Sequence, residues 1–197
     1  LLDKVQPVFS NLSSAETNER LQEIDREVAP LLAAARDDIY LNPRLFARVK
    51  AVWEKRAGLG LNPVQLRLVE EIYKDFVRGG ANLNASDQER LRAINKELSP
   101  LSVRFGNNLL KETNAYRLVV ENQADLAGLP ESTVAGAAEA AKAAGLPGKW
   151  VFTLQAPSIW PFLSYSGNRE LRRQILTAYL KRCDHGDEYD NKAILTR

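Results

Sequence analysis

The residues that could hold a metal ion lie close together near the end of the chain. The 197-residue sequence has one histidine, His185, and one cysteine, Cys183, with Asp184 and Asp187 beside them. A catalytic zinc ion needs about three ligands from His, Cys, Asp or Glu, and further residues that orient those ligands. We expect this segment to be a fraying helix end, which offers no such support. It is therefore predicted to hold no metal.

The single cysteine also bears on the redox environment. One cysteine cannot form a disulfide within the chain, which fits a reducing compartment. A thiol of lowered pKa would make Cys183 reactive, but free cysteines are usually buried. The favoured interpretation is a small buried residue on a helix.

Three other patterns are typical of structural positions. Glu70 and Glu71 are adjacent, and adjacent side chains on a helix point about 100° apart, so they do not form an acid/base pair. The glycines at 58, 60, 79 and 80 indicate helix ends, because no phosphate-binding or dinucleotide-binding pattern follows them. No serine lies in a nucleophile elbow. From the residues alone we predict no catalytic, cofactor-binding or metal-binding residue in this chain.

The composition is that of an ordinary globular protein, with 45% hydrophobic and 26% charged residues. The 27 basic and 25 acidic residues give a net charge of +2, which is too balanced to favour nucleic-acid or membrane-surface binding. No apolar run approaches the roughly 20 residues of a membrane span, and we expect no signal peptide. The sequence has no methionine, so we expect a processed chain or a piece of a longer protein.

The strongest periodic signal runs from Ser86 to Thr113 and predicts one long helix. Ser86 and Glu89 form a candidate capping box, and Pro100 predicts a kink. The helix that ends at Gly79-Gly80 should pack antiparallel against this one, because only a short turn separates them. We expect a buried apolar stripe on one face of the long helix. Its members are Leu91, Ile94, Leu98, Leu101, Phe105 and Leu109.

Further helix starts precede this element. The Asn-Pro pairs at 42–43 and 62–63 each combine a capping side chain with a proline at the first helical position. Ser13 is a candidate cap for a helix that continues through Pro30.

After residue 114 the periodicity changes. Large apolar residues occupy every second position in two segments, at 116, 118 and 120 and at 150, 152 and 154, which predicts two strands that pair in an undetermined direction. The alanine-rich segment 130–145 is predicted to be a helix that covers them. Asn168 should cap a helix that ends at Gly186, and Asp190 or Asn191 should begin another. The predicted fold is mainly α: an antiparallel helical bundle with a two-stranded β element, and a sub-boundary near 114–156.

Short segments spread along the chain match one family in order and spacing. They are DIYLNP at 38–43, LFARV at 45–49, FVRGGANL at 76–83, LAGLP at 126–130 and NRELR at 168–172. Together they resemble the N-terminal helical region of the zinc metallopeptidases that include thimet oligopeptidase and oligopeptidase A. The resemblance is strongest to the bacterial peptidyl-dipeptidase (dipeptidyl carboxypeptidase) branch.

The resemblance implies a function. In that family a His-Glu-x-x-His helix and a further glutamate bind zinc, and the first glutamate acts as general base on a zinc-bound water. This sequence lacks those residues. Residues 1–197 would then be the N-terminal, non-catalytic wall of the substrate channel in a zinc peptidyl-dipeptidase that removes dipeptides from the C-terminus of short peptides. The implied partners are such peptides and the C-terminal catalytic half, in the cytoplasm or alternatively the periplasm.

Three aromatic residues could line such a channel, but Trp150, Trp160 and Tyr165 are each expected to pack in the core. The alternative function is a free-standing helical module that holds a partner helix in a groove and catalyses nothing. The lack of methionine and the short last helical segment favour the peptidase.

Overall fold

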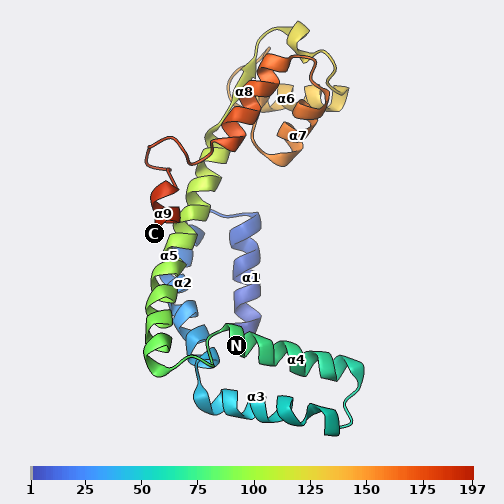
Figure 1. Cartoon of the computed structure of the whole chain (residues 1–197). Helices are drawn as coiled ribbons and strands as arrows, with labels where there is room; N and C mark the ends of the chain where they lie inside the picture. The colour runs from blue at the N-terminus through green and yellow to red at the C-terminus, as the bar shows by residue number, and fades with distance from the viewer. Residues whose placement is uncertain (1) are drawn as a thin grey trace. The chain divides into compact units, whose positions relative to one another are not determined.

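The computed structural model describes the backbone of residues 2–197 and the side chains of Leu2 and residues 4–197. This part of the chain contains nine α-helices and two short strands (Figure 1). It divides into two compact units, residues 1–104 and 105–197, and helix α5 (Ala85–Ala115) contributes to both. The predicted mainly helical fold with a small β element is confirmed.

The regular elements described in the first unit are helices. They are α1 (Leu2–Ala15), α2 (Glu19–Tyr40), α3 (Pro43–Lys55), a 3-10 turn (Arg56–Gly58), α4 (Pro63–Arg78) and the first part of α5. Helices α3 and α4 pack together through stacked rings. The ring of Tyr73 lies 4.9 Å from that of Trp53 and 6.0 Å from that of Phe46, between ring centres.

Both Asn-Pro helix starts are confirmed. The Asn42 side chain accepts hydrogen bonds from the backbone N–H groups of Arg44 and Leu45, both at 3.0 Å. Asn62 and Gln65 form a reciprocal capping box. Each cap satisfies N–H groups that the first helical turn leaves without a backbone partner.

The two predicted serine caps are wrong. Ser13 lies inside α1, and α2 is instead capped by Asn18, whose side chain accepts from the Leu21 N–H at 3.0 Å. Ser86 lies inside α5, where the side chain of Asn84 accepts from the Asp87 N–H at 2.9 Å. Asparagine caps a helix at least as well as serine, and in both places a nearby asparagine takes the role.

The predicted antiparallel pairing of α4 with α5 is also wrong. Figure 1 shows α4 beside α3, with α5 leaving at a steep angle. A Cβ on Gly79 would lie 2.9 Å from the Tyr40 Cβ, and one on Gly80 would lie 2.6 Å from Leu91 Cδ2. The double glycine therefore brings the end of α4 against α2 and α5 at one point and turns the chain away.

The helices α2 and α5 continue through Pro30 and Pro100, as predicted. The apolar stripe of α5, however, is not buried as predicted: the Leu98 side chain is 54% exposed, and Ile94 is exposed as well. Leu91 and Leu98 line an open hollow that α1 and α2 also line, so a packed core does not cover the stripe there. Arg92 of α5 forms an ion pair with Asp38 of α2 at 3.0 Å.

The second unit surrounds a two-stranded sheet. Strand β1 (Leu118–Val120) pairs antiparallel with β2 (Trp150–Phe152), with Leu118 opposite Phe152. The sequence alone did not predict whether the two strands run parallel or antiparallel. The other elements are a 3-10 turn (Gln123–Leu126), α6 (Glu131–Ala143), α7 (Ala156–Tyr165), α8 (Arg169–Leu180) and α9 (Lys192–Thr196). The predicted helix over residues 130–145 and the predicted Asn168 cap are confirmed. The predicted end of the last of these helices at Gly186 is wrong, because α8 ends at Leu180.

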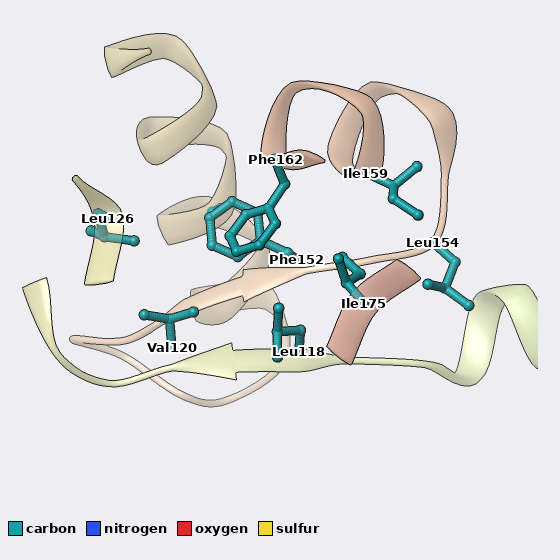
Figure 2. Packing of buried hydrophobic residues seen from close by; sticks show 9 residues of the cluster. Leu118, Val120, Leu126, Phe152, Leu154, Ile159, Phe162 and Ile175 are labelled. Atoms are coloured by element: carbon teal, nitrogen blue, oxygen red, sulfur yellow. The ribbon is translucent and has the colours of Figure 1, made fainter. Parts of the chain in front are cut away.

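The core of the chain lies in this second unit (Figure 2). The rings of Phe152 and Phe162 meet at 4.5 Å between centres with a 54° tilt, a favourable aromatic geometry. Ile159 and Ile175 are fully buried against them. Helix α6 covers the sheet as predicted, with Ala137 in the cluster.

Candidate functional site

The cysteine and histidine near the end of the chain meet one carboxylate. The Cys183 N–H donates to Glu112 of α5, and the Nε2 atom of His185 lies 2.7 Å from Glu112 Oε1. Asp184 pairs with Lys192 instead, at 2.7 Å. Among the described side chains, those of Leu2 and residues 4–197, no group of three from His, Cys, Asp or Glu is placed to hold a metal ion. The contacts of Glu112 with Cys183 and His185 therefore shape the turn that follows α8.

Cys183 is buried, as predicted, but it does not lie on a helix. It follows α8 in a turn with φ +58°, a left-handed conformation that is uncommon for residues other than glycine. Burial, and then the adjacent Glu112 carboxylate, raises the pKa of the Cys183 thiol to about 11. The protonated thiol is a poor nucleophile at neutral pH, so the geometry supports a structural role.

A second contact fixes the segment that follows. Asn108 and Asn191 are both buried, and the Asn108 side-chain amide donates to Asn191 Oδ1 at 2.9 Å. The Asn191 amide in turn donates to the backbone carbonyl of Phe105 at 3.2 Å. Asp190 caps α9 by accepting from the Lys192 N–H at 2.8 Å. These contacts hold residues 183–192 on the second-unit part of α5.

Glu70 and Glu71 belong to an ion-pair network on one face of α4. Arg67 contacts both carboxylates, at 3.3 and 2.9 Å, and Lys74 contacts them at 2.7 and 3.5 Å. The hydrogen bond from Lys74 lowers the pKa of Glu70. A carboxyl group that acts as a general acid needs a raised pKa, whereas this network lowers the pKa of Glu70. The network therefore does not prepare Glu70 for that role.

The three aromatic residues that could line a channel differ in how deeply they are buried. Trp150 packs against the core, as predicted. For Trp160 and Tyr165 the prediction is wrong, since they are 48% and 58% exposed. The Trp160 ring stands edge-on to Tyr179 at 5.4 Å, and the Arg182 guanidinium lies 3.9 Å from the centre of the same Tyr179 ring. These residues are free to contact a ligand or partner.

The first unit contains a hollow of about 720 Å³ lined by α1, α2, α5 and the end of α4. Asp37 lines it and is only 7% exposed, and the Asn95 side-chain amide donates to Asp37 Oδ1 at 2.7 Å. The Ser99 hydroxyl, one turn further along α5, is buried without a hydrogen-bond partner among the described residues. No local sequence pattern indicates this site, because Asp37 and Asn95 are 58 positions apart.

The first unit also exposes many apolar side chains. Among its described residues the buried hydrophobic side chains are Leu41, Phe46 and Phe76, whereas the second unit has a full core. Apolar side chains repeat at helical spacing on the exposed faces of three helices. They are Leu2, Val5, Val8 and Leu12 on α1, Leu31 and Ile39 on α2, and Val64, Leu68 and Ile72 on α4, of which Leu2 and Ile39 also line the hollow. Such extended apolar surfaces mark places where another protein segment packs.

None of the helices described in residues 2–197 is long and apolar enough to span a membrane. No model of a known protein family matches the chain. Individual proteins do match it. The dipeptidyl carboxypeptidase of Escherichia coli (strain K12) is 40% identical over 197 residues, which are 100% of this chain and 29% of that protein.

Related proteins match the same length of chain. The dipeptidyl carboxypeptidase of Salmonella typhimurium is also 40% identical over 100% of the chain and 29% of its own length. The oligopeptidase A of Haemophilus influenzae is 30% identical over 98% of the chain and 29% of its own length. The chain thus spans under one third of these relatives. With this similarity along its whole length, the chain belongs to the family of the dipeptidyl carboxypeptidases and oligopeptidases A.

Proposed function

We propose that this chain is the N-terminal, non-catalytic part of a zinc-dependent peptidyl-dipeptidase, which removes dipeptides from the C-terminus of short peptides. The observation that carries the proposal is the 40% identity over the entire chain to two proteins named dipeptidyl carboxypeptidase, of which it spans 29%. The remaining part of the longer protein would hold the zinc ion, because one histidine cannot supply a His-Glu-x-x-His pair. We place the protein in the cytoplasm, or alternatively the periplasm.

Within that protein, we propose that this chain forms one wall of the substrate channel and packs against the catalytic part. The exposed apolar stripes of α1, α2 and α4 support such packing. Burying apolar surface gives roughly 25 cal/mol per Å², so covering these stripes would stabilise the contact between two parts of a protein. The exposed Trp160 and Tyr165 are candidates for contact with peptides or with the catalytic part.

The test compares the longer protein with the 197-residue chain. The substrate is a short peptide with a blocked amino end and a free carboxyl end, and its amidated form is the control. We expect the longer protein to shorten the free-acid peptide by successive dipeptides, a chelator to stop the reaction, and added zinc to restore it. The chain alone should neither cleave the peptide nor bind zinc stoichiometrically. Chelator-sensitive cleavage by the chain alone would overturn the assignment of a non-catalytic part. No dipeptide release by the longer protein would overturn the proposal and favour a free-standing binding module.

A further inference from the structure

The hollow of the first unit contains a buried carboxylate that lacks a cationic partner. Asp37 is the one charged residue among the buried residues of the described chain, and it forms no ion pair there. Its side chain receives one hydrogen bond, from the neutral amide of Asn95. Buried charges in proteins are normally paired with an opposite charge, because removing an ion from water is costly. An incoming cation would satisfy Asp37.

A second unsatisfied group lies on the same wall. Asn95 and Ser99 are four residues apart on α5, so their side chains lie one above the other on one helix face. The Ser99 hydroxyl is buried without a hydrogen-bond partner in the described chain, and Ser99 is one of the residues that line the hollow. A group with several N–H donors could bond to both the Asp37 carboxylate and the Ser99 hydroxyl. A primary ammonium, with three donors, has this chemistry.

The remaining lining favours a peptide over a simple amine. Leu32, Leu91 and Leu98 supply apolar wall, and the hollow of about 720 Å³ falls within the range of sites for small ligands. Arg36 and Arg78 also line the hollow, with exposed side chains that form no ion pair with a described residue. Their guanidinium groups would oppose an isolated cation but would accept the carboxylate of a zwitterion.

We propose that this hollow binds a short peptide through its free α-amino group, which donates to Asp37 and Ser99. The ligand class rests on the proposed function, since the longer protein would act on short peptides and release dipeptides. The site is separate from the bond-breaking chemistry, because the chain supplies no zinc-binding pair. Side chains of the peptide lie against the leucines, and its carboxylate faces the arginines.

The experiment is a calorimetric titration of the 197-residue chain with the dipeptide Leu-Ala, and with N-acetyl-Leu-Ala as the matched ligand. We expect one site for Leu-Ala and loss of binding on acetylation, which removes the positive charge. Asp37→Asn keeps an acceptor for Asn95 but removes the charge, and should weaken binding by about 10- to 100-fold. The control is Asp38→Asn, because Asp38 is exposed, is paired with Arg92, and should leave binding unchanged.

The variant Ser99→Ala tests whether a loss of binding could come from a folding defect. The Ser99 hydroxyl has no partner within the described chain, so its removal breaks no internal hydrogen bond, and it should weaken binding about fivefold with an unchanged unfolding midpoint. No binding of Leu-Ala, equal binding of the acetylated peptide, or equal affinities of Asp37→Asn and Asp38→Asn would overturn the proposal. None of these results would bear on peptide cleavage by the longer protein, because the titration involves neither zinc nor a bond that is cleaved.

Discussion

The backbone N–H of Cys183 donates a hydrogen bond to the carboxylate of Glu112, 71 residues earlier in the chain. This contact closes the turn after α8 onto α5 and places the Cys183 thiol in a buried site beside a carboxylate. Both features disfavour the thiolate. The low reactivity of the only cysteine therefore comes first from burial and then from Glu112, a residue that no local sequence pattern connects to it.

The raised pKa of Cys183 predicts a loss of stability in alkaline solution. The thiol ionises near pH 9 in the unfolded chain and near pH 11 in the folded one. Below pH 9 both states are protonated and the contribution is fully present. Between pH 9 and 11 the unfolded chain releases its proton first, so the free energy of unfolding falls. Urea unfolding at several pH values should show this fall in the wild type and a smaller one in Cys183→Ala. Equal slopes for the two proteins would contradict the burial of the thiol.

The start of α5 gives a prediction that separates two neighbouring residues. Asn84→Ala should lower the free energy of unfolding by about 1 kcal/mol, because it removes the acceptor for the Asp87 N–H. Ser86→Ala lies inside the helix and should change it by less than about 0.5 kcal/mol. Urea midpoints of the two variants give the comparison. A larger effect at Ser86 than at Asn84 would show that the helix begins two residues later.

Two leucines of different burial test where the core lies. Leu154 is buried in the second unit, and Leu154→Ala should cost roughly 2–5 kcal/mol through lost burial and a cavity. Leu98 is half exposed, so Leu98→Ala should cost less than about 1 kcal/mol in the isolated chain. Thermal or urea unfolding measures both. Similar costs for the two variants would mean that the apolar face of α5 is buried in solution.

Two glycines should respond in opposite directions to alanine. Gly106 lies inside α5 with open space where a Cβ would stand, so Gly106→Ala should stabilise the chain by about 0.5–1 kcal/mol. Gly80 has φ +98° and a Cβ there would lie 2.6 Å from Leu91 Cδ2, so Gly80→Ala should destabilise by more than about 1 kcal/mol. Unfolding midpoints of both variants, compared with the wild type, provide the test. A stabilising Gly80→Ala would show that the close approach of α4 and α5 is absent.

Local signals in the sequence were sufficient for much of the fold. An asparagine followed by proline satisfies helix-start chemistry within four residues, and Asn42 and Asn62 behave accordingly. The alternation of Leu118, Val119 and Val120 likewise matches their burial. These features depend on residues that are adjacent in the chain, so sequence patterns report them directly.

Other features depended on contacts that local patterns do not encode. The apolar period of α5 identified a stripe, but Leu91 and Leu98 of that stripe line an open hollow beside α2, and the contacts across to α2 are polar, Arg92–Asp38 and Asn95–Asp37. Ser86 and Asn84 are both good caps, and the path of the chain after Gly80 decides between them. The hollow around Asp37 and Ser99 forms only when distant helices meet, so no spacing of residues predicts it.

The central claim is that the apolar helix faces of the first unit are the surface on which a separate catalytic part packs. Hydrogen–deuterium exchange tests it most directly, with the 197-residue chain alone and after mixing with the separately produced remainder of the longer protein. We predict slower amide exchange after mixing in α1, α2 and α4, and in residues 190–197, with the core strands β1 and β2 unchanged. Unchanged exchange in these helices, with the two polypeptides eluting separately at equal concentrations, would contradict the account.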